Sequence, residues 1–196
     1  NGNGLYILNS GKVKHFTSSY KEENVISEIK VVNNRIFMAT RGGMLELDTT
    51  NGKFKKTAIS SPVYGFSKVV DLNKFYVSGD KKIYLYNFEN NSLSKVNIDT
   101  NKKNRSYKRI ALHNNKLWIL NESYGITIYD LSSNTSVQLA PPSIKDTEHF
   151  KMIVDKDNAV WIGTSSYGMM KYDSGKQKFR LYIINTFSFY LGFSFF

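Results

Sequence analysis

One pattern recurs along the chain and constrains its fold more than any other feature. An apolar segment around Trp161 leads through a turn into an alternating segment that ends in Asp, and the same pattern surrounds Trp118, 43 residues earlier. The copies lie at residues 4–9 (a half copy), 36–48, 75–87, 117–130 and 160–173. Self-similarity at a period of about 40–45 residues, built from short strands, is typical of propeller blades. A single blade cannot bury both of its faces, so the array of blades is the folding unit.

Each repeat predicts four strands joined by tight turns. The first strands are expected at 26–32, 66–70, 107–112 and 150–154, and the second strands carry Phe37, Tyr76, Trp118 and Trp161. The third strands alternate apolar and polar residues and end at Asp48, Asn87, Asp130 and Asp173. The fourth strands, at 53–57, 93–96, 136–139 and 178–182, are more polar, as suits an outer edge that must not pair with other chains. We expect an all-β fold with no helix beyond a turn.

The repeats divide the chain into about four complete blades and one half blade. The expected boundaries are 1–24 (partial), 25–62, 63–105, 106–148 and 149–182, followed by a non-repeat tail at 183–196. That tail is uncharged and rich in Phe. It either supplies inner strands to the half blade and closes a small ring, or is a truncated or misread end of a reading frame. Without such closure, two blade faces are left uncovered, and we expect oligomerisation or poor solubility.

Composition narrows the possible partners. The formal net charge is +11, but most of the 27 basic residues are lysines scattered through turns and outer strands, and only 101–105 forms a cluster. Nucleic-acid binding requires clustered basic residues with stacking aromatics, so a solvated surface is favoured and no nucleic-acid partner is expected. The chain has no cysteine and no apolar run of about 20 residues, so disulfides and a membrane span are not expected. Any signal peptide is expected outside this segment.

The last repeat resembles a known family. Residues 160–164, 168–173, Gly175, Lys176 and Phe179, together with 155–158 before the aromatic strand, resemble the two-component-regulator propeller repeat. This repeat occurs in the periplasmic sensors of hybrid two-component systems of Bacteroidetes. The match is close in the last repeat, fair in the repeat with Trp118, where Leu120 and Asn121 replace a Gly-Thr pair, and degenerate in the earlier two.

The resemblance implies a large propeller, usually seven-bladed and often in tandem, of which this chain is a fragment. It also implies a periplasmic location, glycan ligands, and further domains after the propeller: a smaller all-β domain, a membrane helix, a histidine kinase, a receiver and a DNA-binding module. The partners expected for this chain are therefore an oligosaccharide and either the remaining blades or a second copy of the chain.

No catalytic or metal-binding pattern is present in the sequence. His15, His113 and His149 are far apart, and each is expected in a loop or at a strand end. The segment beginning at Asp155 faintly resembles a calcium loop, but Val160 and Ser166 stand where such a loop needs Gly and Glu, so a hairpin turn is favoured. We expect no cofactor, no metal and no enzymatic activity in this chain.

Ligand recognition is expected on the loops between second and third strands, which share one face with the connections between blades. This face would carry Arg41, Tyr64, Asp80, Lys81, Lys82, Tyr107, Asn121, Glu122, Tyr124, Ser165, Ser166, Tyr167 and the loop 141–148. Tyr124 and Tyr167 occupy equivalent positions and could contact successive sugar units, with hydrogen bonds from Arg41 and Glu122. The alternative is an ordinary solvated surface. Trp118 and Trp161 either stack on sugars or pack between blades, and recurrence at the blade period favours packing.

Three functions fit these observations. A non-catalytic sensor segment that recognises a carbohydrate is favoured by the family resemblance. A propeller that serves as a protein-interaction scaffold is the main alternative, and a polysaccharide lyase or hydrolase built on blades is the third.

Overall fold

The computed structural model describes residues 2–98, 107–121, 125–139, 149–157, 159–164, 168–173 and 178–183, with only the backbone of 149 and 150. The chain forms two compact units, residues 1–146 and 147–196. The first unit contains a hairpin and three four-stranded sheets, and the second contains one further four-stranded sheet. Among the described residues, no helix has the length and apolar character needed to cross a membrane.

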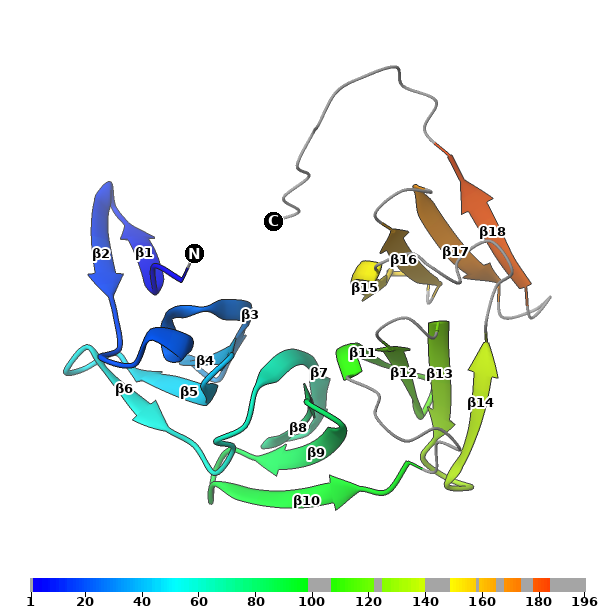
Figure 1. Cartoon of the computed structure of the whole chain (residues 1–196), viewed down its shortest axis with the longest axis horizontal. Helices are drawn as coiled ribbons and strands as arrows, with labels where there is room; N and C mark the ends of the chain where they lie inside the picture. The colour runs from blue at the N-terminus through cyan, green and yellow to red at the C-terminus, as the bar shows by residue number, and fades with distance from the viewer. Residues whose placement is uncertain are drawn as a thin grey trace. The chain divides into compact units, whose positions relative to one another are not determined.

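All five sheets are antiparallel and connect neighbouring strands in chain order (Figure 1). The hairpin is β1 (Leu5–Asn9) and β2 (Lys12–Phe16), followed by a 3-10 turn at Lys21–Asn24. The first sheet consists of β3 (Ile26–Val32), β4 (Arg35–Thr40), β5 (Gly43–Asp48) and β6 (Lys53–Lys56). The second consists of β7 (Val63–Asp71), β8 (Lys74–Gly79), β9 (Lys82–Asn87) and β10 (Ser92–Val96). The third consists of β11 (Tyr107–His113), β12 (Lys116–Asn121), β13 (Gly125–Asp130) and β14 (Thr135–Leu139). The fourth consists of β15 (His149–Val154), β16 (Val160–Thr164), β17 (Met169–Asp173) and β18 (Lys178–Tyr182).

This architecture confirms the predicted all-β fold of four four-stranded blades with a two-stranded partial blade at the N-terminus. The turns form where asparagine was expected to allow them: Asn33, Asn34, Asn114 and Asn115 all have positive φ, between 46° and 59°. The predicted first strand of the second repeat was too short. It begins at Val63 rather than at residue 66, because buried Val63 pairs with Gly79 and the strand continues through several bulges. The predicted repeat boundaries and the tail stay predictions.

The core of the first unit lies between the sheets. The second-strand aromatics of the first two sheets face the sheet that follows: Phe37 packs among Phe75, Tyr86 and Phe88, which belong to the second sheet or directly follow β9. Tyr76 belongs to a cluster with Leu117 and other residues of the third sheet. Leu5 of the hairpin packs in the same way against the first sheet. The first and second sheets therefore bury both of their faces against their neighbours in the chain, as expected for blades.

Candidate functional site

A repeated irregularity shapes the inner strands β3, β7 and β11. Near its start, each of these strands contains a register shift, between Ile26 and Glu28, between Val63 and Gly65, and between Tyr107 and Arg109. A β-bulge leaves its extra residue outside the ladder and redirects the neighbouring side chains. The extra residues, Ser27, Tyr64 and Lys108, come together at one end of the three strands, which contact one another in chain order.

Arg109 connects these three bulges. Its Nη1 donates to the carbonyl oxygen of Tyr64 and, at 3.2 Å, to that of Lys108. Its Nη2 lies 3.5 Å from the carbonyl oxygen of Ser27. A guanidinium offers five donors in a rigid plane, so one side chain can satisfy several carbonyl groups that the bulges leave out of the sheet. Arg109 thereby fixes the inner strands of three sheets to each other.

An aromatic ring and a second cation lie beside this arginine. The Lys108 ammonium stands 4.4 Å from the centre of the Tyr64 ring, within the range of a cation–π contact. Gly65 allows the strands to approach, because a Cβ there would lie only 3.0 Å from Oε2 of Glu28. The result is a partly exposed cluster of one tyrosine, two cations and one carboxylate, defined here as the inner-edge cluster: Glu28, Tyr64, Lys108 and Arg109.

The described residues of the predicted ligand face occupy different environments. Arg41 lies exposed in the turn between β4 and β5, and its backbone N–H donates to the carbonyl oxygen of Val25 at 3.2 Å. Asp80 and Lys81 form the turn between β8 and β9, and Lys82 begins β9. Three of the four residues predicted to bind ligand lie outside the described residues: Glu122, Tyr124 and Tyr167. The ligand-binding assignment of all four residues therefore stays a prediction, as it does for Ser165, Ser166 and 141–148, which also lie outside the described residues.

Two members of the predicted face are structural. Tyr107 is buried in the cluster between the second and third sheets, and Asn121 is buried with its Nδ2 donating to Thr127 Oγ1 at 2.7 Å. The repeat pattern predicts both on the loop face, Asn121 in the loop between second and third strands and Tyr107 beside the connection between blades. Their burial depends on how the sheets pack, which the sequence pattern of one repeat does not report.

A buried carboxylate supports the turn that carries Arg41. Glu23 accepts hydrogen bonds from Lys56 Nζ at 2.8 Å and from the Ser18 hydroxyl, and Gly42 N–H donates to the neighbouring Glu22 carbonyl at 3.1 Å. Burial raises the pKa of the Glu23 carboxyl, but the hydrogen bonds from Lys56 and Ser18 and the charge of Lys56 outweigh burial and leave the pKa below its ordinary value. Glu23 is therefore ionised at neutral pH and ties β6 to the turn.

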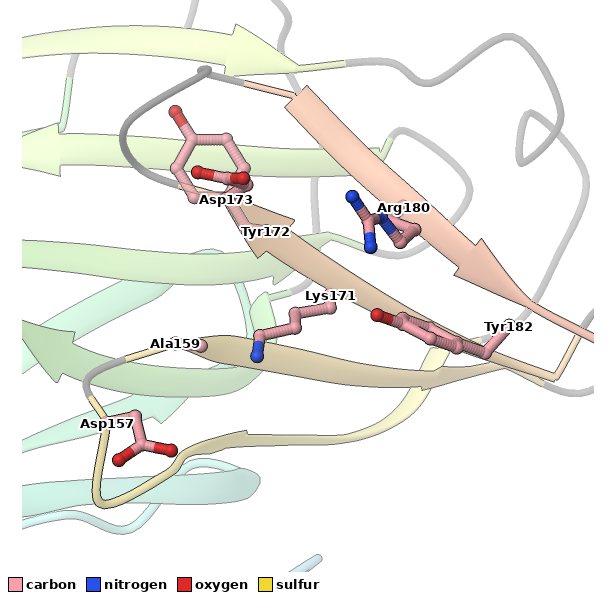
Figure 2. A pocket seen from close by; sticks show the side chains of 7 residues that line it. All are labelled: Asp157, Ala159, Lys171, Tyr172, Asp173, Arg180 and Tyr182. Carbon is pink, nitrogen blue, oxygen red and sulfur yellow. The ribbon is translucent and has the colours of Figure 1, made fainter.

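The second unit has its own shallow cleft, of about 320 Å³, on one face of the fourth sheet (Figure 2). Lys171 and Arg180 pair in register on β17 and β18, and Tyr182 and Asp157 line the same space. Trp161 lies on this face and is partly exposed. Its ring packs against that of Tyr182 at a tilt of 36°, with the centroids 5.4 Å apart, and the Lys171 ammonium lies 4.9 Å from the Trp161 ring centre. The sequence analysis considered Trp161 but missed Lys171, Arg180 and Tyr182, although strand alternation and pairing place Trp161, Lys171 and Arg180 on one face.

Asp155 begins a turn. The sequence pattern favoured a hairpin turn here over a calcium loop. Its Oδ1 accepts the backbone N–H groups of Asp157 and Ala159, at 2.9 and 2.8 Å, and its Oδ2 accepts Trp161 Nε1 at 2.6 Å. The Trp161 hydrogen bond, followed by that of the Ala159 backbone, lowers the pKa of the Asp155 carboxyl. The described residues contain no group of three or more His, Cys, Asp or Glu side chains placed to hold a metal ion.

Solved structures match this fold over most of the chain, whereas no protein-family model and no curated protein matches the sequence. The extracellular domain of BT4673 from B. thetaiotaomicron, described as a one-component system, is 14% identical with a TM-score of 0.76, over 95% of this chain and 29% of that one. The extracellular domain of BT3049 from the same organism, described as a hybrid two-component system, is 16% identical with a TM-score of 0.75, over 91% of this chain and 27% of that one.

An enzyme shares the same architecture. A catalytically inactive virginiamycin B lyase from Staphylococcus aureus, solved with quinupristin, is 14% identical with a TM-score of 0.74, over 94% of this chain and 64% of that one.

This chain spans less than a third of the length of the BT4673 and BT3049 domains. At these identities the likeness establishes the blade-built fold and agrees with the resemblance carried by residues 155–179.

Proposed function

We propose that this chain is part of the extracellular propeller of a bacterial two-component-type sensor, and that the propeller recognises a carbohydrate without transforming it. The observation that carries the proposal is the likeness to the extracellular domains of BT4673 and BT3049, which extends over more than nine tenths of the chain. Signal transfer to a kinase would belong to parts of the parent protein outside this chain. A periplasmic location and association with further blades, or with a second copy of the chain, are parts of the same proposal.

The inner-edge cluster supports recognition of a polyhydroxylated ligand. Tyr64 offers an aromatic face, and Lys108 and Glu28 add a charged donor and a charged acceptor beside it. Arg109 and the bulges hold these groups on strands rather than on a free loop, which reduces the entropy lost on binding. Arg41, Glu122, Tyr124 and Tyr167 stay the ligand residues predicted from the sequence.

Calorimetry on the complete extracellular domain of the parent protein, titrated with a panel of neutral and acidic oligosaccharides, tests this proposal. We expect one class of oligosaccharide to bind, and Tyr64→Ala, Tyr124→Ala and Tyr167→Ala each to weaken it about tenfold or more through loss of a ring contact. Tyr6→Ala is the matched control, because Tyr6 is an exposed tyrosine that stacks on His15 of the N-terminal hairpin.

Two results would overturn the proposal. Absence of binding across the whole panel would contradict the proposal that the propeller recognises a carbohydrate. Accumulation of cleaved or unsaturated sugar products would instead favour an enzyme, the class to which the lyase neighbour belongs.

A further inference from the structure

A groove of about 570 Å³ lies between the second and third sheets of the first unit. Its walls come from Tyr76, Leu85 and Ser94 of the second sheet and from Tyr129, Leu131 and Asn134 of the third. Tyr76, on β8, and Tyr129, on β13, both belong to the buried cluster between the two sheets, and Leu85 and Leu131 pack against that cluster. Tyr76, Leu85, Ser94 and Tyr129 lie on strands, and Leu131 and Asn134 lie in the short turn between β13 and β14.

The equivalent space between the first and second sheets is filled. There Arg35 donates to both carboxylate oxygens of Glu46, at 2.5 and 2.7 Å, and to the carbonyl oxygen of Phe88. Its guanidinium also stands 5.1 Å from the Phe37 ring centre and 5.4 Å from that of Phe88. One side chain of the first sheet thus fills the space against the second.

The residues that fill the first space are replaced at the second. Glu46 becomes Leu85 and Arg35 becomes Lys74, each 39 residues later, and Phe88 becomes Leu131, 43 residues later. Lys74 contacts Asp71 of its own sheet at 3.4 Å. The groove exists because the bridging ion pair and one phenylalanine are missing from an otherwise equivalent interface.

The groove is amphipathic and carries neutral hydrogen-bonding groups. Tyr76 is 7% exposed, and within the described part of the chain no residue hydrogen-bonds its hydroxyl group. The Tyr129 hydroxyl donates to Asn134 Oδ1 at 2.9 Å, so the donors on Asn134 Nδ2 are directed elsewhere. Lys95 is the one charged residue among the described residues that line the groove, and its pairing with Tyr84 places it on the opposite face of β10 from Ser94.

We propose that this groove binds a neutral pyranose ring. Such a ring has an apolar C–H face, which matches the two leucines, and hydroxyl groups, which match an amide, a serine and a partly buried phenol. A carboxylated sugar would meet Lys95 alone as a cation, from the face of β10 opposite to Ser94, and a fully apolar ligand would leave the phenol and amide without partners at a cost in free energy. The volume lies within the range of about 300–1,000 Å³ of small-molecule sites. The ligand class rests on the proposed carbohydrate function, whereas the location is independent of the inner-edge cluster.

Saturation-transfer NMR on the full chain tests the site with methyl β-glucopyranoside, methyl β-galactopyranoside and methyl α-mannopyranoside as probes, and with glucuronate as the acidic comparison. We expect millimolar binding of at least one neutral glycoside and weaker binding of glucuronate. Ser94→Tyr should abolish transfer by filling the groove, and Tyr76→Phe should weaken binding about threefold to tenfold through the loss of one hydroxyl. Lys55→Tyr is the matched control, because Lys55 stands at the equivalent position of the first sheet.

Tyr64→Ala separates this site from the proposed function. Binding that survives Tyr64→Ala and is lost in Ser94→Tyr supports the groove, even if no oligosaccharide binds at the inner edge. Binding that is unchanged in both Ser94→Tyr and Tyr76→Phe, or no transfer from any of the three glycosides, overturns the proposal. Tyr76→Phe adds no volume, so its result stands even if Ser94→Tyr disturbs the fold.

Discussion

The first and second sheets meet at a filled interface, whereas the second and third sheets meet at an interface with a groove. Both use the same framework: Tyr86 donates to Asn91 at 3.0 Å in one, and Tyr129 donates to Asn134 at 2.9 Å in the other. The two interfaces differ in the side chains that occupy the space next to this tyrosine–asparagine pair. Arg35, Glu46 and Phe88 close the first interface, and Leu131 and Leu85 leave the second open.

This difference shows how a repeat fold separates stability from recognition. The strands and turns depend on local residues that every copy retains. The space between sheets depends on a few side chains that can change from copy to copy without disturbing the strands. A groove can therefore arise at one interface while the neighbouring interface continues to stabilise the array.

The largest expected effect is on the aromatic core of the first interface. Phe75→Ala removes a fully buried ring that contacts four others, with centroid distances of 5.4 Å to Phe37 and 5.5 Å to Phe66 among them. We expect the free energy of unfolding to fall by about 3–5 kcal/mol, measured by equilibrium urea denaturation.

The equivalent substitution at the second interface is Leu117→Ala, for which we expect a smaller loss, nearer about 2–3 kcal/mol. Leu117 is fully buried too, but its cluster borders the groove and its neighbours can relax into it. An equal or larger loss for Leu117→Ala would show that the groove does not loosen the second interface.

A second prediction concerns the pH dependence of stability. Burial, together with the charge of Glu46, raises the pKa of Tyr86 to about 12 despite the opposing charge of Arg35. The unfolded chain releases this proton near pH 10, before the folded chain does, so the stabilisation is complete below about pH 10 and is lost as the pH rises to about 12. The effect is on the order of 2 kcal/mol. Tyr86→Phe should flatten this part of the curve of unfolding free energy against pH, and should remove a late-titrating group from the absorbance titration at high pH.

The framework could be predicted from sequence because its causes are local. Asp48 and Asp130 end their strands as expected, because each Oδ1 accepts a backbone N–H two residues ahead, Thr50 or Ser132, at 2.9 Å. Backbone hydrogen bonds also lower the pKa of both carboxyl groups, from Thr50 to Asp48 and from Ser133 and then Ser132 to Asp130. Such turns form within four or five residues, and the sequence shows their donors and acceptors directly.

The candidate sites could not be predicted in the same way, because their contacts join distant repeats. Arg109 reaches Ser27 across 82 residues, and Arg35 reaches Phe88 across 53. Nothing in one repeat identifies the residue that a long side chain will meet in the next. For the same reason Tyr107 and Asn121 were assigned to a surface, although the packing of their sheets buries them.

The smallest predicted effect isolates one hydrogen bond that, among the described residues, only the filled interface has. Asn91 and Asn134 are 43 residues apart, both have φ of 56°, and both accept a tyrosine hydroxyl. Asn91 Oδ1 also accepts the backbone N–H of Ala58, in the connection between β6 and β7, at 2.9 Å. Asn91→Gly and Asn134→Gly each relieve the same backbone conformation and remove the same tyrosine contact, so the difference between their unfolding free energies reports the bond from Ala58. We expect Asn91→Gly to cost more by about 0.5–1.5 kcal/mol in urea denaturation. Equal costs would mean that water replaces this bond without loss, and that the first interface is held by its aromatic rings and ion pair alone.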